Sequence, residues 1–222
     1  MRSDEPKAQS RDDSPLDGTQ QPANNDEAPK VIENIKSLHS DWKRPRFNRR
    51  ELLLSGLIGS GAFSGNVFAN KTKFWNQDRR LWLRRESTKE EFDLPFVVGG
   101  QLHYQNYVRL CYLLRDVSDN NTTVEIDVAL LNLLYGVQEW ARKLSYRDCV
   151  ICVNSGHRTA RHNARVEGAA LNSMHLYGKA VDITMNGVSL PTLASMASFF
   201  GAGGIGSYAT FLHVDVGTVR HW

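Results

Sequence analysis

Histidine and aspartate residues near the C-terminal end of this 222-residue chain have types and spacing suited to metal chemistry. Asp182 follows His175 by seven positions, and His213 lies further along the chain. Zinc accepts nitrogen and oxygen ligands, so these three side chains are able to form a two-histidine, one-carboxylate site. The residues alone leave open a commoner alternative, in which each histidine is simply solvated or hydrogen-bonded.

Such a site would have hydrolytic chemistry. A zinc ion held by three protein ligands keeps one position for water and lowers the pKa of that water towards about 7, which gives a hydroxide nucleophile at neutral pH. A strand over 211–216 would present His213 and Asp215 on one face and apolar residues on the other. The apolar face would anchor the sheet while the rigid backbone holds the polar pair.

Three segments around these residues carry fixed positions in a recognisable order. Residues 155–163 read SGHRTARHN, residues 173–183 read SMHLYGKAVDI, and residues 211–217 read FLHVDVG, followed by Arg220 and Trp222. They resemble the S-G-Y-R-[ST]-x-x-x-N signature, the S-x-H-x-x-G-x-A-x-D-I zinc motif and the closing F-x-H-x-D-x-G block of M15-type peptidases. Residues 113–116 and 126–127 are also similar to the exported subgroup, which contains murein endopeptidases related to D-alanyl-D-alanine carboxypeptidases and to the hedgehog fold.

This resemblance covers residues 78–222 and implies roles for the residues of the site. The implied Zn2+ ligands are His175, Asp182 and His213. The resemblance implies that Arg158 binds a substrate carboxylate or polarises the scissile carbonyl, and either role suits a permanently charged guanidinium with several donors. Ser173 would hydrogen-bond the substrate or shape its loop, and Gly178 would relieve crowding beside the metal.

Two features depart from the family pattern. His157 replaces the usual tyrosine of the first motif, and we expect it to be an exposed side chain or an extra proton donor at the rim of the site. Several M15 branches place Glu or Asp two or three residues before the last histidine, where this chain has Phe211 and Thr210. Asp215 is then the best-placed carboxylate, and it would act either as the general base or as the residue that orients His213.

Together these features predict an exported zinc metallopeptidase that hydrolyses amide bonds in peptidoglycan stem peptides or crosslinks. The bond that is cut, and the choice between endopeptidase and carboxypeptidase, stay open. The expected partners are peptidoglycan peptides and the export machinery. A non-catalytic zinc-containing module that binds the cell wall is the alternative. Nucleic-acid binding through Arg158, Arg161 and Arg165 is disfavoured, because the net charge is only +3 and such arginines usually form a solvated face.

An α+β fold similar to that of hedgehog and D-Ala-D-Ala peptidases is expected to position these residues, as a small antiparallel sheet with flanking helices. Hydrophobic residues make up 41% of the chain and charged residues 23%, which excludes a wholly disordered or collagen-like protein. Apolar spacing predicts helices over 102–115, 127–144 with Asp127 as N-cap, and 191–200, plus a short basic helix ending near 166. The expected strands are 81–83, 150–153, 178–185 and 211–216, and 201–206 is expected to be a flexible turn.

The three cysteines are too few for a disulfide-stapled scaffold. Cys149 and Cys152 have the spacing of a redox or metal pair. In a strand, however, residues three apart point to opposite faces, so these thiols would diverge. We therefore expect structural cysteines.

The chain is expected to divide into a disordered extension at 1–47, a twin-arginine-type signal or anchor at 48–69, and a zinc peptidase domain at 75–222. The extension has too few apolar residues to offset the entropy lost on ordering. Arg49 and Arg50 precede an apolar run that ends at Ala69, which resembles a twin-arginine export signal. Retention as a membrane anchor over 52–69 is the alternative. The expected location is periplasmic or otherwise exported.

Overall fold

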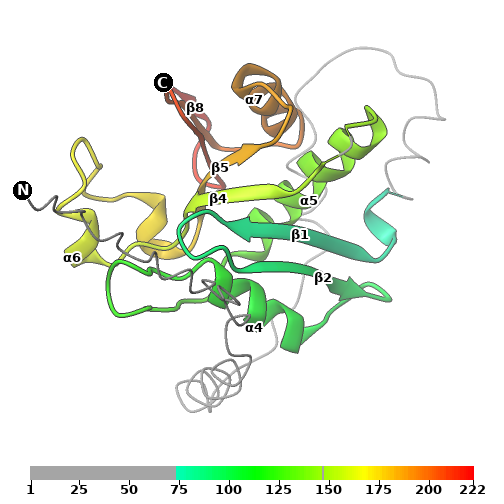
Figure 1. Ribbon diagram of the computed structural model, residues 1–222, viewed down its shortest axis with the longest axis horizontal. Helices are drawn as coiled ribbons and strands as arrows, with labels where there is room; N and C mark the ends of the chain where they lie inside the picture. The colour runs from blue at the N-terminus through cyan, green and yellow to red at the C-terminus, as the bar shows by residue number, and fades with distance from the viewer. Residues whose placement is uncertain (1–73, 147) are drawn as a thin grey trace, which may run out of the picture.

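An open eight-stranded sheet runs through the part of the chain that the computed structural model describes, residues 74–146 and 148–222 (Figure 1). Its strands are β1 (Arg79–Arg85), β2 (Glu91–Val98), β3 (Gln101–Leu102), β4 (Ile151–Ser155), β5 (Ala180–Met185), β6 (Gly204–Ser207), β7 (Leu212–Asp215) and β8 (Arg220–His221). Their order in the sheet is β3-β2-β1-β4-β5-β7-β6-β8. The β1–β4 and β6–β8 pairs are parallel. The mixture of helices and strands is as expected. The sheet is larger than the small antiparallel sheet predicted, and it is mixed, because only five of its seven strand pairings are antiparallel.

Helices α4 (Tyr104–Leu113), α5 (Val128–Lys143) and α7 (Leu190–Phe199) form where the apolar spacing predicted them. Asp127 is the N-cap of α5, and its side chain accepts a hydrogen bond from the backbone N–H of Ala129. Two short elements, α6 (Ala160–Asn163) and the 3-10 helix η1 (Met174–Tyr177), lie in the segments that lead to the site. The basic helix α6 is shorter than expected.

Two expected segments, the extension 1–47 and the signal or anchor 48–69, lie outside the described residues. Within residues 74–146 and 148–222, no helix combines the length and the apolar character that crossing a membrane requires.

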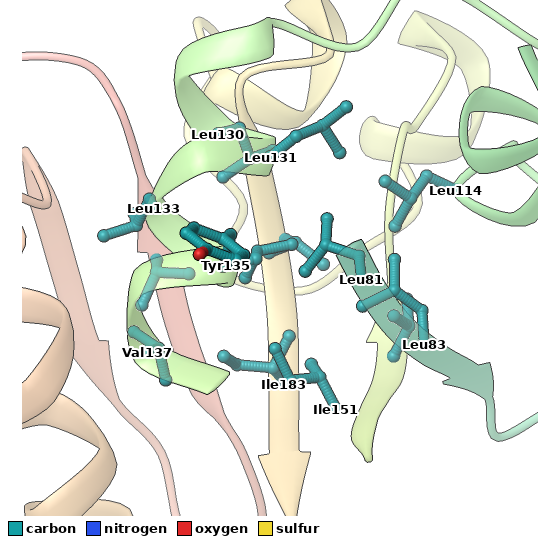
Figure 2. Close-up of a cluster of buried hydrophobic side chains, with 14 of the residues drawn as sticks. Leu81, Leu83, Leu114, Leu130, Leu131, Leu133, Tyr135, Val137, Ile151 and Ile183 are labelled. Carbon is teal, nitrogen blue, oxygen red and sulfur yellow. The ribbon is translucent and has the colours of Figure 1, made fainter. Parts of the chain in front are cut away.

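The main hydrophobic core lies between α5 and one face of the sheet. Figure 2 shows side chains of β1, β4 and β5 meeting those of α5. Leu81, Leu83, Ile151 and Ile183 are fully buried in this cluster, and burying a side chain of that size contributes about 1.5–3 kcal/mol. Because side chains alternate along a strand, the polar residues next to this core point to the other face. The helices thus anchor one face and leave the opposite face for the site.

Strands β2 and β6 were not expected from the sequence. β2 carries acidic residues and Pro95, and it forms because it pairs with residues 79–84 of β1. β6 contains two glycines, Gly204 and Gly206, and it was expected to be part of a flexible turn. It is a strand because its backbone pairs with β7 on one side and β8 on the other.

A β-bulge at the end of β4 brings Ser155 to the site. The β4–β5 register shifts between Val153 and Ser155, and Ser155 then pairs directly with Asp182. Without the extra residue, Ser155 would share the face of Val153, which is in the core. The bulge therefore moves Ser155 to the face that carries Asp182.

Candidate metal centre

The structure brings His175, Asp182 and His213 together, as the sequence predicted. His175 comes from η1, Asp182 from β5 and His213 from β7, where Asp182 and His213 are direct antiparallel partners. Each residue offers a ligand atom, and these atoms lie within 4.8 Å of one another. His175 Nε2 is 3.1 Å from His213 Nδ1 and 3.2 Å from Asp182 Oδ1, and His213 Nδ1 is 2.9 Å from the same oxygen. All three side chains are buried.

A backbone carbonyl fixes the tautomer of His175. Its Nδ1 lies 2.6 Å from the carbonyl oxygen of Gly156, an oxygen that can only accept a hydrogen bond. Nδ1 therefore carries the proton, and the lone pair of Nε2 points at the other two ligands. Burial lowers the pKa of His175, although the hydrogen bond that a protonated Nε2 would donate to Asp182 opposes this shift. The imidazole is thus held neutral, which is the form that binds a metal.

His213 uses its two ring nitrogens on opposite sides. Nδ1 faces His175 and Asp182, and Nε2 lies 3.2 Å from Asp215 Oδ2. Burial would lower the pKa of His213, but the two carboxylates outweigh burial and raise it. A cation at the centre would replace the proton on Nδ1, since metal binding to imidazole releases protons.

Asp215 lies behind His213 and is saturated with donors. Its side chain is fully buried and accepts hydrogen bonds from the backbone N–H groups of Gly204 (2.9 Å) and Gly217 (2.8 Å) and from Arg220 Nη2 (2.5 Å). Burial would raise the pKa of Asp215, but His213 and these donors outweigh it and lower the pKa. The imidazole ring separates this carboxylate from the ligand atoms. Its position fits the orienting role better than that of a general base.

Asp182 links the imidazoles to Arg158. Oδ1 faces both histidines, and Oδ2 accepts a hydrogen bond from Arg158 Nη2. Burial would raise the pKa of Asp182, but its contacts with the two histidines and the charge of Arg158 outweigh burial and lower the pKa. Arg158 Nε also donates to Ser155 Oγ at 2.9 Å, so the bulged end of β4 aims the guanidinium at the site.

For three neighbouring residues, the sequence either left the role open or predicted a different environment from the one in the structure. Ser173 caps η1, where its hydroxyl accepts a hydrogen bond from the backbone N–H of His175, as the loop-shaping alternative requires. His157 is buried, not exposed, and its Nδ1 lies 3.0 Å from the carbonyl oxygen of His175. Gly178 has φ 64°, and a Cβ there would lie 2.4 Å from the carbonyl oxygen of Glu125. The crowding at Gly178 therefore comes from Glu125 and not from the metal ligands.

Sequence reasoning gave no role to two buried aspartates that hold the loop carrying Arg158. Asp116 accepts hydrogen bonds from the backbone N–H of Thr159 (2.8 Å) and from His162 Nδ1 (2.9 Å). Asp119 accepts from Thr159 Oγ1 at 2.5 Å and from Arg161 Nε at 3.1 Å. Asp116 lies within the 113–116 match and carried a signal there, whereas Asp119 lies outside the matched motifs.

The donor set fits zinc. Two imidazole nitrogens and one carboxylate oxygen converge, one imidazole is held neutral, and the carboxylate is held ionised. Each histidine also binds a partner through its other nitrogen, Gly156 for His175 and Asp215 for His213. Such outer partners fix the orientation of metal-binding histidines. The arrangement is therefore suited to a metal with an open coordination position.

Comparisons with known proteins show the family to which the chain belongs. A model of the M15 peptidase family described as peptidoglycan L,D-endopeptidase MepK matches residues 73–222. The probable peptidoglycan L,D-endopeptidase MepK of Haemophilus influenzae is 35% identical over 181 residues, which span 78% of this chain and 94% of that protein. The peptidoglycan L,D-endopeptidase MepK of Escherichia coli K12 is 32% identical, over 79% of this chain and 97% of its own length. The predicted family of murein peptidases is therefore confirmed, and the chain belongs to this family of M15 peptidases.

Proposed function

We propose that this protein is a zinc-dependent endopeptidase that hydrolyses amide bonds in peptidoglycan peptides. The convergence of His175, Asp182 and His213 in a member of this family is the observation that carries the proposal. Its relatives are named L,D-endopeptidases, so we assign the same bond type here, an amide between an L- and a D-configured centre. A hedgehog-like arrangement of the family fold is part of the same proposal.

Each residue of the site has a proposed task. A bound zinc ion would supply a Lewis acid that polarises the amide carbonyl and lowers the pKa of water. Asp182 holds its charge close to the two imidazoles, and Asp215 orients His213 through Nε2. Arg158 would stabilise negative charge that develops on the carbonyl oxygen, since its guanidinium reaches the site beside Asp182. Ser173 would keep η1, and thus His175, in place.

Export from the cytoplasm is a further part of the proposal. Peptidoglycan peptides lie outside the cytoplasmic membrane, so an enzyme acting on them has to be exported. The paired Arg49 and Arg50 ahead of the apolar run at 52–69 support a twin-arginine-type signal. We therefore place the folded part in the periplasm or an equivalent exported compartment, with the export machinery and peptidoglycan as its partners.

Muropeptide digestion tests this function. The zinc-loaded protein is incubated with crosslinked muropeptides, and the products are separated and identified by mass. We expect the zinc-loaded protein to produce new peptide ends. Their formation should stop when zinc is removed with a chelator and resume when zinc is added back. The His213→Ala variant, which removes one ligand, should lose bound zinc and activity together. Unchanged muropeptides in the zinc-loaded wild-type sample would contradict the proposal.

A further inference from the structure

An exposed indole lies beside the candidate metal centre. The ring centroid of Trp222 is 5.3 Å from that of His213, and 51% of the residue is exposed. None of the tasks proposed above uses this side chain. An exposed aromatic ring next to buried metal ligands is a surface that a bound substrate can cover.

Several contacts hold the indole in place. The backbone N–H of Trp222 donates to the carbonyl oxygen of Ile205 at 3.2 Å, and its carbonyl oxygen accepts from the N–H of Ser207 at 2.9 Å. The indole Nε1 donates to the hydroxyl of Tyr208 at 3.1 Å. The guanidinium of Arg220 lies 5.1 Å from the ring centroid. A ring fixed in this way loses little conformational entropy when a ligand covers it.

Gly206 lets the indole lie against the sheet at the level of the site. Gly206 is the direct partner of His213 across β6 and β7. A Cβ at Gly206 would lie 2.6 Å from Cε2 of Trp222, so only the bare backbone of β6 leaves room for the ring. The ring therefore rests against the backbone of β6.

We propose that Trp222 is the binding platform for the hydrocarbon arm of the residue that flanks the scissile amide. This inference rests on the proposed function, which places the scissile carbonyl where the three ligands meet. One residue of an extended peptide spans about 3.3–3.6 Å, so a ring this close to His213 is within reach of the first residue on one side of the amide. A flat indole covers a chain of methylenes better than a single methyl group. Trp222 thus selects a long-armed residue, such as a diamino acid, over alanine.

Paired substrates test this selection. One muropeptide carries a diamino acid next to the scissile amide, and its counterpart carries alanine at the same position. For the zinc-loaded Trp222→Ala variant we expect kcat/KM on the long-armed substrate to fall about tenfold, mainly through KM, because burying each methylene strengthens binding about fourfold. The kcat/KM of this variant on the alanine substrate should change less than about twofold. Trp222→Phe should keep most of the preference, and bound zinc should stay at the wild-type level.

A second variant removes the platform without removing the tryptophan. Gly206→Ala introduces the Cβ that collides with the ring, and we expect the same selective loss. Phe199→Ala is the matched control, because Phe199 is an aromatic residue of α7 that is 69% exposed and outside the site. It should leave the preference unchanged. Equal losses on both substrates, loss of zinc, or an unchanged preference in both Trp222→Ala and Gly206→Ala would overturn the inference.

Calorimetry separates this inference from the proposed function. If the zinc-loaded wild-type protein cleaves neither peptide, the proposed function fails, and binding of the same two peptides still tests the platform. We then expect the wild-type protein to bind the long-armed peptide about tenfold more tightly than the alanine peptide. Trp222→Ala should remove that difference, and a difference that persists would overturn the inference.

Discussion

Asp182 holds the site together at the scale of single residues. One of its oxygens faces both imidazoles, and the other accepts a hydrogen bond from Arg158. The same carboxylate thus ties the two imidazoles to Arg158, the cation expected near the substrate. Removing Asp182 would leave Arg158 without its carboxylate partner as well as remove a ligand, so Asp182 variants cannot separate the two tasks.

Asp215 allows a cleaner test. Asp215→Asn keeps the shape of the side chain but removes the charge behind His213, and loss of such an outer partner typically weakens metal binding about 10–100-fold. We expect zinc affinity to fall by that amount, measured by competition with a chromophoric chelator. Asp93→Asn, an exposed aspartate on β2, is the control and should bind zinc like the wild type. Wild-type zinc affinity in Asp215→Asn, with activity lost, would instead point to a general base.

The sequence predicted that three side chains converge better than it predicted their surroundings. The ordered motifs singled out His175, Asp182 and His213, and the structure brings these side chains together. The partner of Arg158 depends on the bulge that turns Ser155 towards Asp182, and the burial of His157 depends on its contact with His175. Both are tertiary effects that residue spacing does not encode.

Among the elements, α5 was predictable and β6 was not. Regular leucine spacing and the Asp127 cap predict α5 from local signals alone. The glycines of β6 have poor strand propensity, and the strand exists because two neighbours pair with it. β2 was missed for a similar reason, since its pairing with β1 outweighs the presence of Pro95. Pairing between distant segments therefore decides the parts of the sheet that sequence analysis missed.

The end of η1 gives a prediction at the element scale. Gly178→Ala should destabilise the protein, because alanine is strained at φ 64° and its Cβ would collide with the Glu125 carbonyl oxygen. Gly187→Ala is a matched control, because Gly187 has φ 74° and a Cβ there would meet no atom within 4 Å. The left-handed conformation alone costs roughly 1–2 kcal/mol, so Gly187→Ala should lose about that amount. Chemical denaturation should show a larger loss for Gly178→Ala, and equal losses would contradict the steric explanation.

Helix α4 gives a prediction about pH. Burial raises the pKa of Cys111 to about 12, above the value of about 8.5 expected in the unfolded chain. The folded protein therefore keeps this thiol protonated, and the stability this provides is present below about pH 8.5 and is lost as pH rises towards 12. Between pH 8 and pH 10 the wild type should lose about 2 kcal/mol more unfolding free energy than Cys111→Ala. If urea denaturation showed equal losses of unfolding free energy in the wild type and Cys111→Ala, Cys111 would not contribute to the pH dependence of stability.

At the scale of the whole molecule, metal binding should be linked to stability. The three ligands come from η1, β5 and β7, and a ligand that binds only the folded state stabilises it. With zinc at a thousandfold excess over its dissociation constant, we expect a gain of about 4 kcal/mol and a rise in Tm of roughly 10 °C over the chelated protein. Calorimetry on Asp182→Asn should show almost no zinc-dependent shift. If zinc did not change the Tm of the wild type, this would contradict a zinc site built from η1, β5 and β7.

The pairing of β5 with β7 makes correct strand alignment a condition for any chemistry at all. If the register of β7 shifted by one residue, His213 and Asp215 would point into the hydrophobic core, and Leu212 and Val214 would point towards the site. If the register shifted by two residues, so that Asp215 paired with Asp182, the two negative charges would repel each other. Molecules with a misaligned β7 would therefore be inactive instead of partly active. The activity of a sample should then be proportional to the fraction of its molecules in which β5 and β7 pair in the native register.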